Sequence, residues 1–462
     1  MTAEEKYKMM VETPVEQLVC SLSVPTIVSM LITAVYNMAD TFFVSQINTS
    51  ASAAVGVSFP LMTLSQAIGF TLGSGAGNSI SRLLGQKDRK SASRMAATGF
   101  ITALAIGFIL AVQGLVFLDK LVYALGATQT IAPYARDYIK FILIGMPFTI
   151  SSFVLNNILR FQASAFYSMI GIGTGGIINI FLDPIFIFYL NLGTAGAALA
   201  TIISQFISFM ILYYNSNRGG NIKIKFRNFT PHWQIYREIL RIGLPSFYRQ
   251  ALASVATICL NIAAGPFGDA AIAAMSIVGR VIHFAFSIML GLGQGFQPVC
   301  GFNYGAKLYD RVLEAFCFCV KLSAAVLVVL AATGFIFSPR IIALFRKEDL
   351  DVIAIGTRAL RFQCLTLPLC SWTVTTNMIS QNIGKEKQSS ILAISRQGMF
   401  FLPAVLILPR WLGVLGIQLS QPIADILSFL LSLPIGIGIL RELKSLQNCE
   451  SKYIHAENAF NI

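Results

Sequence analysis

Carboxylates inside long apolar runs are the residues of this chain whose types and spacing suggest chemistry. Asp40, Asp183 and Asp425 each stand in such a run, and an ionised side chain at the centre of a bilayer costs at least about 2.5 kcal/mol. Asn179 precedes Asp183 by four residues, so a helix would place both side chains on one face. Carboxylate and amide oxygens suit Na⁺ or a shared proton better than a soft metal. Two carboxylates held close cannot both ionise cheaply, so such a pair can bind and release H⁺.

The predicted cation-coupling residues all lie in the first half of the chain. They are Asp40, Asn157, Asn179, Asp183 and Thr201. Of these, Asp40, Asn179, Asp183 and Thr201 are the expected ligands if the cation is Na⁺. The alternative is that these groups only bond to helix backbones and fix the packing, and it applies most to Asn157 and Thr201.

A second polar set is predicted to line a substrate cavity or to gate it. Its members are Asn37, Asn156, Arg249, Gln250, Arg280 and Asp425. Because buried charges are usually paired, Arg249 and Asp425 are also expected to form a buried ion pair, which would give them a structural role.

The composition is that of a polytopic membrane protein. Of the 462 residues, 55% are hydrophobic and 12% are charged, and the mean hydropathy is +0.70, whereas a soluble chain is about a quarter charged. The net charge of +13 comes from short basic clusters between apolar runs, as in cytoplasmic loops, so we expect no nucleic-acid partner. The eight cysteines follow neither a disulfide pattern nor a zinc pattern.

A membrane-spanning helix needs about 20 mostly apolar residues, and the chain offers twelve such runs. They lie near 17–44, 52–78, 93–117, 134–160, 165–190, 194–214, 238–264, 270–299, 312–337, 356–382, 388–409 and 413–440. Lys and Arg gather after the even-numbered runs, for example in segments 82–94 and 218–227. Because these residues favour the cytoplasmic side, both termini are expected in the cytoplasm.

The two halves of the chain repeat each other with a shift of about 220 residues. The shift relates Pro25 to Pro245, Leu72-Gly73 to Leu292-Gly293, Lys87 to Lys307 and Gly193 to Gly413. We therefore expect an all-α fold of two six-helix lobes: an N-lobe at 1–214, a basic cytoplasmic linker at 215–236, and a C-lobe at 237–462 that ends in a short polar tail. Repeats of this kind are typical of alternating-access carriers, which bind substrate near the membrane midplane.

The polar residues of the first half are not repeated in the second. At the same shift, Asp40 meets Leu260, and Asp183 meets Pro403. Only one of the two similar bundles has this polar cluster. A role in packing alone would be expected in both bundles, so the difference favours a functional role.

Three stretches give the sequence a family resemblance. GVSFPLMTLSQAIGFTLGSGAGNSISRLLGQKD (56–88), GLGQGFQPVCGFNYGAKLYDRV (291–312) and LDPIFIFYLNLGTAGAALAT (182–201) strongly resemble the MATE (multidrug and toxic compound extrusion) transporters. The resemblance runs from about Pro14 to Leu440 and is greatest to the bacterial DinF-like branch, near its MepA-like members. In that branch the coupling site lies in the N-lobe, where Asp40, Asn179, Asp183 and Thr201 stand. The C-lobe carboxylates of the NorM-like branch have no match here.

The resemblance implies a carrier in the plasma membrane of a bacterium, not an enzyme. It would export small amphipathic, often cationic drugs in exchange for H⁺ or Na⁺, with membrane lipid around it and with no cofactor besides the coupling ion. We expect a monomer. The alternative is a flippase of the same superfamily that moves a lipid-linked precursor, which would need a strongly basic cavity and helices beyond twelve.

Overall fold

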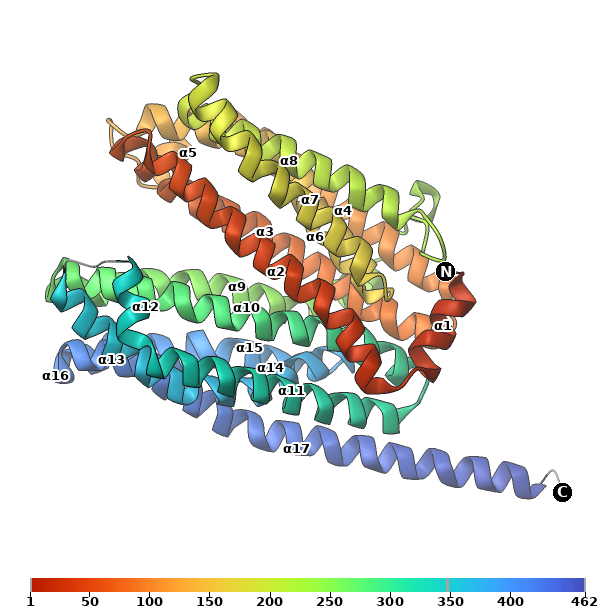
Figure 1. Ribbon diagram of the computed structural model, residues 1–462. Helices are drawn as coiled ribbons and strands as arrows, with labels where there is room; N and C mark the ends of the chain where they lie inside the picture. Colours follow the sequence, from red (N-terminus) through yellow and green to blue (C-terminus); the bar gives the residue numbers. More distant parts are fainter. Residues whose placement is uncertain (1, 346–348, 461–462) are drawn as a thin grey trace. The chain divides into compact units, whose positions relative to one another are not determined.

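The protein is helical throughout the part that the computed structural model describes, residues 2–345 and 349–460, with no β-strand in those ranges (Figure 1). The helices of the first half are α1 (Ala3–Glu12), α2 (Val15–Ser45), α3 (Thr49–Gly85), α4 (Arg89–Val116), α5 (Leu118–Ala124), α6 (Ala132–Phe161), α7 (Ala165–Pro184), the π-helix η1 (Ile185–Tyr189) and α8 (Gly193–Ser216).

The second half follows a 3₁₀ turn, η2 (Phe226–Asn228), in the linker. Its elements are α9 (Trp233–Ala264), η3 (Gly265–Phe267), α10 (Asp269–Gly305), α11 (Tyr309–Ile336), α12 (Ser338–Phe345), α13 (Leu350–Thr366), η4 (Leu367–Leu369), α14 (Cys370–Asn382), α15 (Glu386–Ile394), the π-helix η5 (Ser395–Phe401), α16 (Leu402–Leu412) and α17 (Val414–Phe460).

Eleven helices within the described ranges are long and apolar enough to cross a membrane, and they match eleven of the twelve predicted runs. The remaining run, 356–382, forms α13 and α14 with the 3₁₀ turn η4 between them. Pro368 lies in that turn. Proline has no N–H to donate and disfavours helical backbone in the residue before it, so the run is divided into two shorter helices.

The chain divides into two compact units that do not coincide with the two sequence halves. One unit comprises Met1–Tyr7 and Val24–Ala251, and the other comprises Lys8–Ser23 and Leu252–Ile462. The beginning of α2 thus belongs to the second unit, and the first part of α9 belongs to the first. The division that the sequence predicts, with an N-lobe at 1–214, a linker at 215–236 and a C-lobe at 237–462, stays a prediction.

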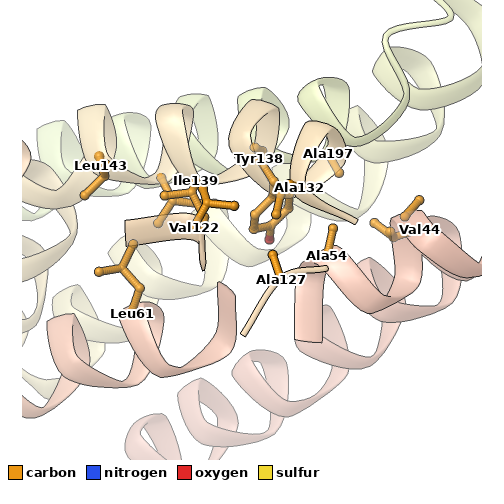
Figure 2. Close-up of a cluster of buried hydrophobic side chains, with 14 of the residues drawn as sticks. Val44, Ala54, Leu61, Val122, Ala127, Ala132, Tyr138, Ile139, Leu143 and Ala197 are labelled. Carbon is orange, nitrogen blue, oxygen red and sulfur yellow. The ribbon is translucent and has the colours of Figure 1, made fainter. Parts of the chain in front are cut away.

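In the first unit α6 is the central helix. Of its most apolar window, 67% is buried, more than in any other candidate span of the described chain. Its side chains Tyr138, Ile139 and Leu143 pack against Ala54 and Leu61 of α3 (Figure 2). Helices α3, α4, α7 and α8 all contact α6, so the side chains of α7 and α8 that point toward α6 lie in a packed interior.

Each unit contains a crossing where two helix backbones touch. In the first unit a Cβ at Gly75 would lie 2.0 Å from the carbonyl oxygen of Ile239, in α9. In the second unit a Cβ at Gly295 would lie 2.5 Å from the backbone of Ser23, whose Oγ donates to the carbonyl oxygen of Leu292 at 3.2 Å. Gly75 and Gly295 are separated by the 220-residue shift. The same close crossing therefore occurs twice, and the internal repeat is confirmed in three dimensions.

The N-terminal helix α1 docks onto the first unit through a buried lysine. Lys6 is 8% exposed, and its Nζ donates to Ser164 Oγ and Asn221 Oδ1. Ser164 Oγ also donates to Asn221 Oδ1 at 2.8 Å. Burial is the main reason that the pKa of Lys6 falls to about 8, and the positive charge of Arg89 lowers it further.

Candidate functional site

Three of the predicted cation-coupling residues meet between α7 and α8. Asn179 Nδ2 donates to Asp183 Oδ1 at 3.1 Å and to Thr201 Oγ1 at 3.4 Å. Thr201 Oγ1 donates in turn to the carbonyl oxygen of Ala197 at 3.1 Å. Asp183 is fully buried and Asn179 is 2% exposed. The four-residue spacing therefore places Asn179 and Asp183 on one helix face, as the sequence predicts.

The backbone changes directly after Asp183. Helix α7 ends at Pro184 and continues as the π-helix η1. π-Helical turns are rare and often occur at functional sites. Pro184 has no N–H to donate to the preceding turn, which accounts for a change of helix type at this position.

Asp40 supplies a second carboxylate to the interior of the same unit. It lies near the end of α2, is 8% exposed, and interacts electrostatically with Asp183 and with the phenols of Tyr36 and Tyr138. Tyr138 comes from α6. Four helices, α2, α6, α7 and α8, thus position this group of side chains.

Three oxygens of this group have no hydrogen-bond partner among the described residues: Asp40 Oδ1, Asp183 Oδ2 and Asn179 Oδ1. Buried polar atoms are rarely left in this state unless a water, an ion or a function accounts for them. All three are hard acceptors, so the donor set fits a proton or Na⁺. No three Asp, Glu, His or Cys side chains converge as a metal site in the described ranges.

Asn157 lies in a different group of side chains. Its Nδ2 donates to the carbonyl oxygen of Phe153 at 2.7 Å, and its Oδ1 accepts from Arg160 Nη2 at 2.7 Å. Both ends of the amide are thereby engaged, which favours the packing alternative for this residue. Asn156 is also buried, and its Nδ2 donates to Ser168 Oγ.

The remaining members of the predicted cavity set do not form one cluster. Gln250, in α9, donates to Gln66 Oε1 in the first unit, and Arg249 beside it is partly buried. Asn37 and Arg280 are both exposed. Their role in a cavity or gate stays a prediction.

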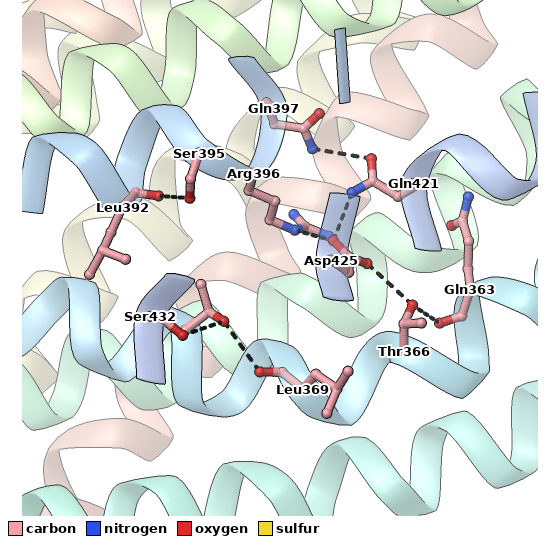
Figure 3. Close-up of polar contacts among 11 residues, drawn as sticks. Gln363, Thr366, Leu369, Leu392, Ser395, Arg396, Gln397, Gln421, Asp425 and Ser432 are labelled. Atoms are coloured by element: carbon pink, nitrogen blue, oxygen red, sulfur yellow. Dashed lines mark hydrogen bonds and ion pairs between the residues drawn. The ribbon is translucent and has the colours of Figure 1, made fainter. Parts of the chain in front are cut away.

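Asp425 is paired with Arg396, so the expected pair of Asp425 with Arg249 is wrong. Arg396 Nε lies 2.7 Å from Asp425 Oδ1, and the two side chains are 16% and 3% exposed. Gln421 Nε2 donates to the same oxygen at 2.8 Å, and Thr366 Oγ1 donates to Oδ2 at 3.4 Å (Figure 3). Arg249 belongs to the first unit and Asp425 to the second, and the partner of Asp425 comes from within its own unit.

Sequence reasoning missed Arg396 and Tyr138. Arg396 stands inside the predicted run 388–409, and an arginine in an apolar run is a signal of the same kind as the aspartates. The π-helix η5 contains it, and its guanidinium also lies over the ring of Phe286, 4.4 Å from the centroid. Tyr138 gave no signal, because tyrosines are common at the ends of apolar runs.

Long apolar helices in two repeated bundles, with uncompensated carboxylates inside one of them, define a polytopic membrane protein of the kind that carries ions or solutes. The model of the MatE family matches residues 25–185 and 245–406, more than half of the chain. The chain belongs to this family of transporters, and the predicted resemblance, the fold class and the absence of an enzyme function are confirmed.

Relatives match over nearly the whole length. The multidrug export protein MepA of Staphylococcus haemolyticus (strain JCSC1435) is 28% identical over 420 residues, which are 90% of this chain and 91% of that protein. MepA of Staphylococcus aureus (strain MSSA476) is 27% identical over 442 residues, 95% of this chain and 97% of that protein. A solved outward-facing structure of a multidrug resistance MATE family transporter of the MOP superfamily has a TM-score of 0.89 at 27% identity, covering 95% of this chain and 98% of that one.

Proposed function

We propose that this chain is a secondary antiporter that exports small amphipathic, often cationic compounds in exchange for H⁺ or Na⁺. The observation that carries the proposal is the set of three partnerless oxygens on Asp40, Asn179 and Asp183 in the interior of one unit. The relatives' names, which describe multidrug export, support the class of substrate.

The coupling residues act by changing their charge. When Asp40 and Asp183 are ionised, they hold negative charge inside a packed helical unit, which attracts a cationic compound. Asn179 orients Asp183 by donating to its Oδ1. When the two carboxylates take up the coupling cation, this charge is neutralised and the attraction for the exported compound falls. Export is coupled only because the two ligands bind the alternating conformations unequally.

Helix α2 is suited to respond to that change. Pro25 lies inside α2 and cannot donate the backbone bond that would hold the preceding turn. Ser29 Oγ donates to the carbonyl oxygen of Pro25 at 2.9 Å, a bond type that often bends helices. Neutralisation of Asp40, at the other end of α2, would remove the electrostatic interactions that hold this end of the helix in one position. The helix could then repack about the proline.

The surroundings of the protein follow from its sequence pattern. The basic segments after the even-numbered runs support an orientation in a bacterial plasma membrane with both termini in the cytoplasm. Small drug-like molecules and membrane lipid would be its partners, and we expect it to act as a monomer.

The test is transport of ethidium by purified protein in proteoliposomes of known orientation, with a pH gradient or a Na⁺ gradient imposed separately. We expect one of the two gradients to drive transport in the wild type. Asp40→Asn and Asp183→Asn should each abolish it at normal expression, because an amide cannot exchange the cation. Asp137→Asn is the matched control, since this aspartate is exposed and lies outside the coupling site.

A fully active Asp183→Asn carrier would refute the assigned coupling site. A folded wild-type protein that moves no ethidium under either gradient would refute drug export, and the same vesicles would then be tested for movement of a pyrophosphate-bearing lipid, the cargo of a flippase.

A further inference from the structure

A small cavity lies inside the first unit between α2, α6, α7 and α8, next to the coupling residues. It has a volume of about 20 Å³, and besides apolar groups its lining includes the polar side chains of Tyr36, Ser152, Asn179, Thr201, Ser204 and Ser208. A polar cavity holds a water molecule once about 10–15 Å³ is accessible to it. Because Asn179 and Thr201 belong to the cation site, the cavity begins where that site ends.

Three of the lining serines are unusual for a helical interior. Ser152, Ser204 and Ser208 are 1–2% exposed, and none of their hydroxyls has a hydrogen-bond partner in the described part of the chain. A buried helical hydroxyl can donate to the carbonyl of the preceding turn, as Ser58 does to Ala54 and Ser65 to Leu61. The three hydroxyls are therefore available to bond to a molecule in the cavity, and the volume of the cavity is large enough for water.

The hydroxyls continue along one face of α8. Thr201, Ser204 and Ser208 are three and four residues apart, a spacing that puts them in one row on a helix. Ser216 lies two turns beyond Ser208 at the end of α8 that joins the linker. It is fully buried, and its hydroxyl also lacks a partner among the described residues.

One apolar residue interrupts the row. Leu212 lies between Ser208 and Ser216 in α8 and is fully buried. It packs against Gly171 of α7 so closely that a Cβ there would lie 2.3 Å from Leu212 Cδ2. The row of hydroxyls is therefore interrupted at one position by a tightly packed apolar side chain, which has to move before a proton can pass.

We propose that this row of α8 hydroxyls is the route by which a proton passes between Asp183 and the linker end of the unit, with Leu212 as its gate. The proposal rests on the proposed antiport function and assigns H⁺ as the coupling cation. The O–H bond of protonated Asp183 breaks and its proton passes to water beside Asn179. Each following hydroxyl, on Ser204 and then Ser208, accepts one proton and releases its own. From Ser208 the proton crosses to Ser216, eight residues and about 12 Å further along α8, through water that enters when Leu212 moves aside. Every relay group ends neutral, Asp183 becomes a carboxylate, and one H⁺ leaves at Ser216.

The test compares proton movement with drug binding in the same proteoliposomes, with a pH-sensitive dye inside. In Ser204→Ala/Ser208→Ala we expect proton flux driven by an ethidium gradient to fall about tenfold, which is about 1.4 kcal/mol of barrier, at unchanged ethidium affinity. Ser151→Ala is the matched control. Ser151 is equally buried and equally partnerless in the described chain, but it does not line the cavity, so its flux should stay at the wild-type value.

A second variant tests the gate in the opposite direction. Leu212→Ser should let protons leak down a pH gradient without any drug, and adding Asp183→Asn should stop the leak. Wild-type flux in the double serine variant, or a leak that does not depend on Asp183, would overturn the route while the antiporter stands. Ethidium transport by the wild type that is driven by Na⁺ alone would overturn the proton route and leave the export function in place. No transport under either gradient would remove the proposed function itself.

Discussion

The ion pair of Arg396 with Asp425 provides the sharpest stability prediction. The perturbation is Asp425→Asn, which keeps the shape of the side chain and removes its charge. Arg396 would remain, 84% buried as a side chain, without the carboxylate that lies 2.7 Å from its Nε. Removing one partner of a buried pair typically costs about 3–5 kcal/mol, because the other charge is left uncompensated. We expect a loss of folding free energy in that range.

Two further variants separate the charge from the hydrogen bonds. In Asp425→Asn/Arg396→Gln both charges are gone and two amides can still bond, so the loss should shrink to about 1–2 kcal/mol. Gln421→Leu removes one bond to the carboxylate, at 2.8 Å, and leaves both charges in place, so it should cost about 1 kcal/mol. The coupling energy between the two charged residues then follows from the double-mutant cycle.

The assay is chemical unfolding in mixed micelles, with ethidium transport measured after the same purified proteins are reconstituted into proteoliposomes. The folded double variant should transport like the wild type, because the pair lies outside the coupling site. If Asp425→Asn unfolds within about 1 kcal/mol of the wild type, the pair does not stabilise the fold. If the double variant is stable and does not transport, Arg396 or Asp425 acts in the transport cycle, and the structural assignment is refuted.

Two other predictions concern the first unit. Because burial, assisted by Arg89, lowers the folded-state pKa of Lys6 from 10.5 to about 8, the unfolded chain binds more protons between these pH values. Stability should therefore rise with pH across this window, by at most about 3 kcal/mol, and Lys6→Met should abolish the rise; a variant with the wild-type pH profile would contradict it. Gly75→Ala should lower the free energy of unfolding by about 1–3 kcal/mol, since the new Cβ would lie 2.0 Å from the carbonyl oxygen of Ile239. Gly56→Ala, at a position in open space on the same helix, should not lower the free energy of unfolding when it is measured in parallel.

Most of the fold can be predicted from the sequence because two patterns in the sequence determine it. Apolar runs long enough to span a bilayer define the helices, and the 220-residue shift defines the repeat. The proximity of Asn179 and Asp183 could be predicted because two residues that are four positions apart in a helix lie on the same face. Pro368 could have predicted the broken run, but whether a proline kinks a helix or ends it depends on the neighbours that satisfy the freed backbone.

The partners of charged residues could not be predicted in the same way. Arg249 and Asp425 looked complementary, yet a pair between distant segments depends on packing that no local pattern encodes. The boundary of the units at Ser23 and Ala251 likewise depends on packing between distant segments, such as the close backbone crossings at Gly75 and Gly295. A glycine at such a crossing looks like any other glycine in an apolar run.

The internal repeat allows the surroundings of Asp183 in the first unit to be compared with those of Asp425 in the second. At the 220-residue shift Gln421 and Asp425 correspond to Thr201 and Gln205, so both units put polar groups on the same face of their sixth helix. In the second unit an arginine neutralises the carboxylate permanently. In the first unit the described residues offer Asp183 the amide of Asn179 but no cation at salt-bridge distance, and oxygens of both carboxylates lack a partner. A bound cation would supply there the positive charge that Arg396 supplies to Asp425 in the second unit, but unlike an arginine a bound cation can dissociate. We therefore expect the charge of Asp40 and Asp183, and not that of the Arg396–Asp425 pair, to change during transport. For this reason the loss of Asp183 should stop transport and the loss of the pair should not.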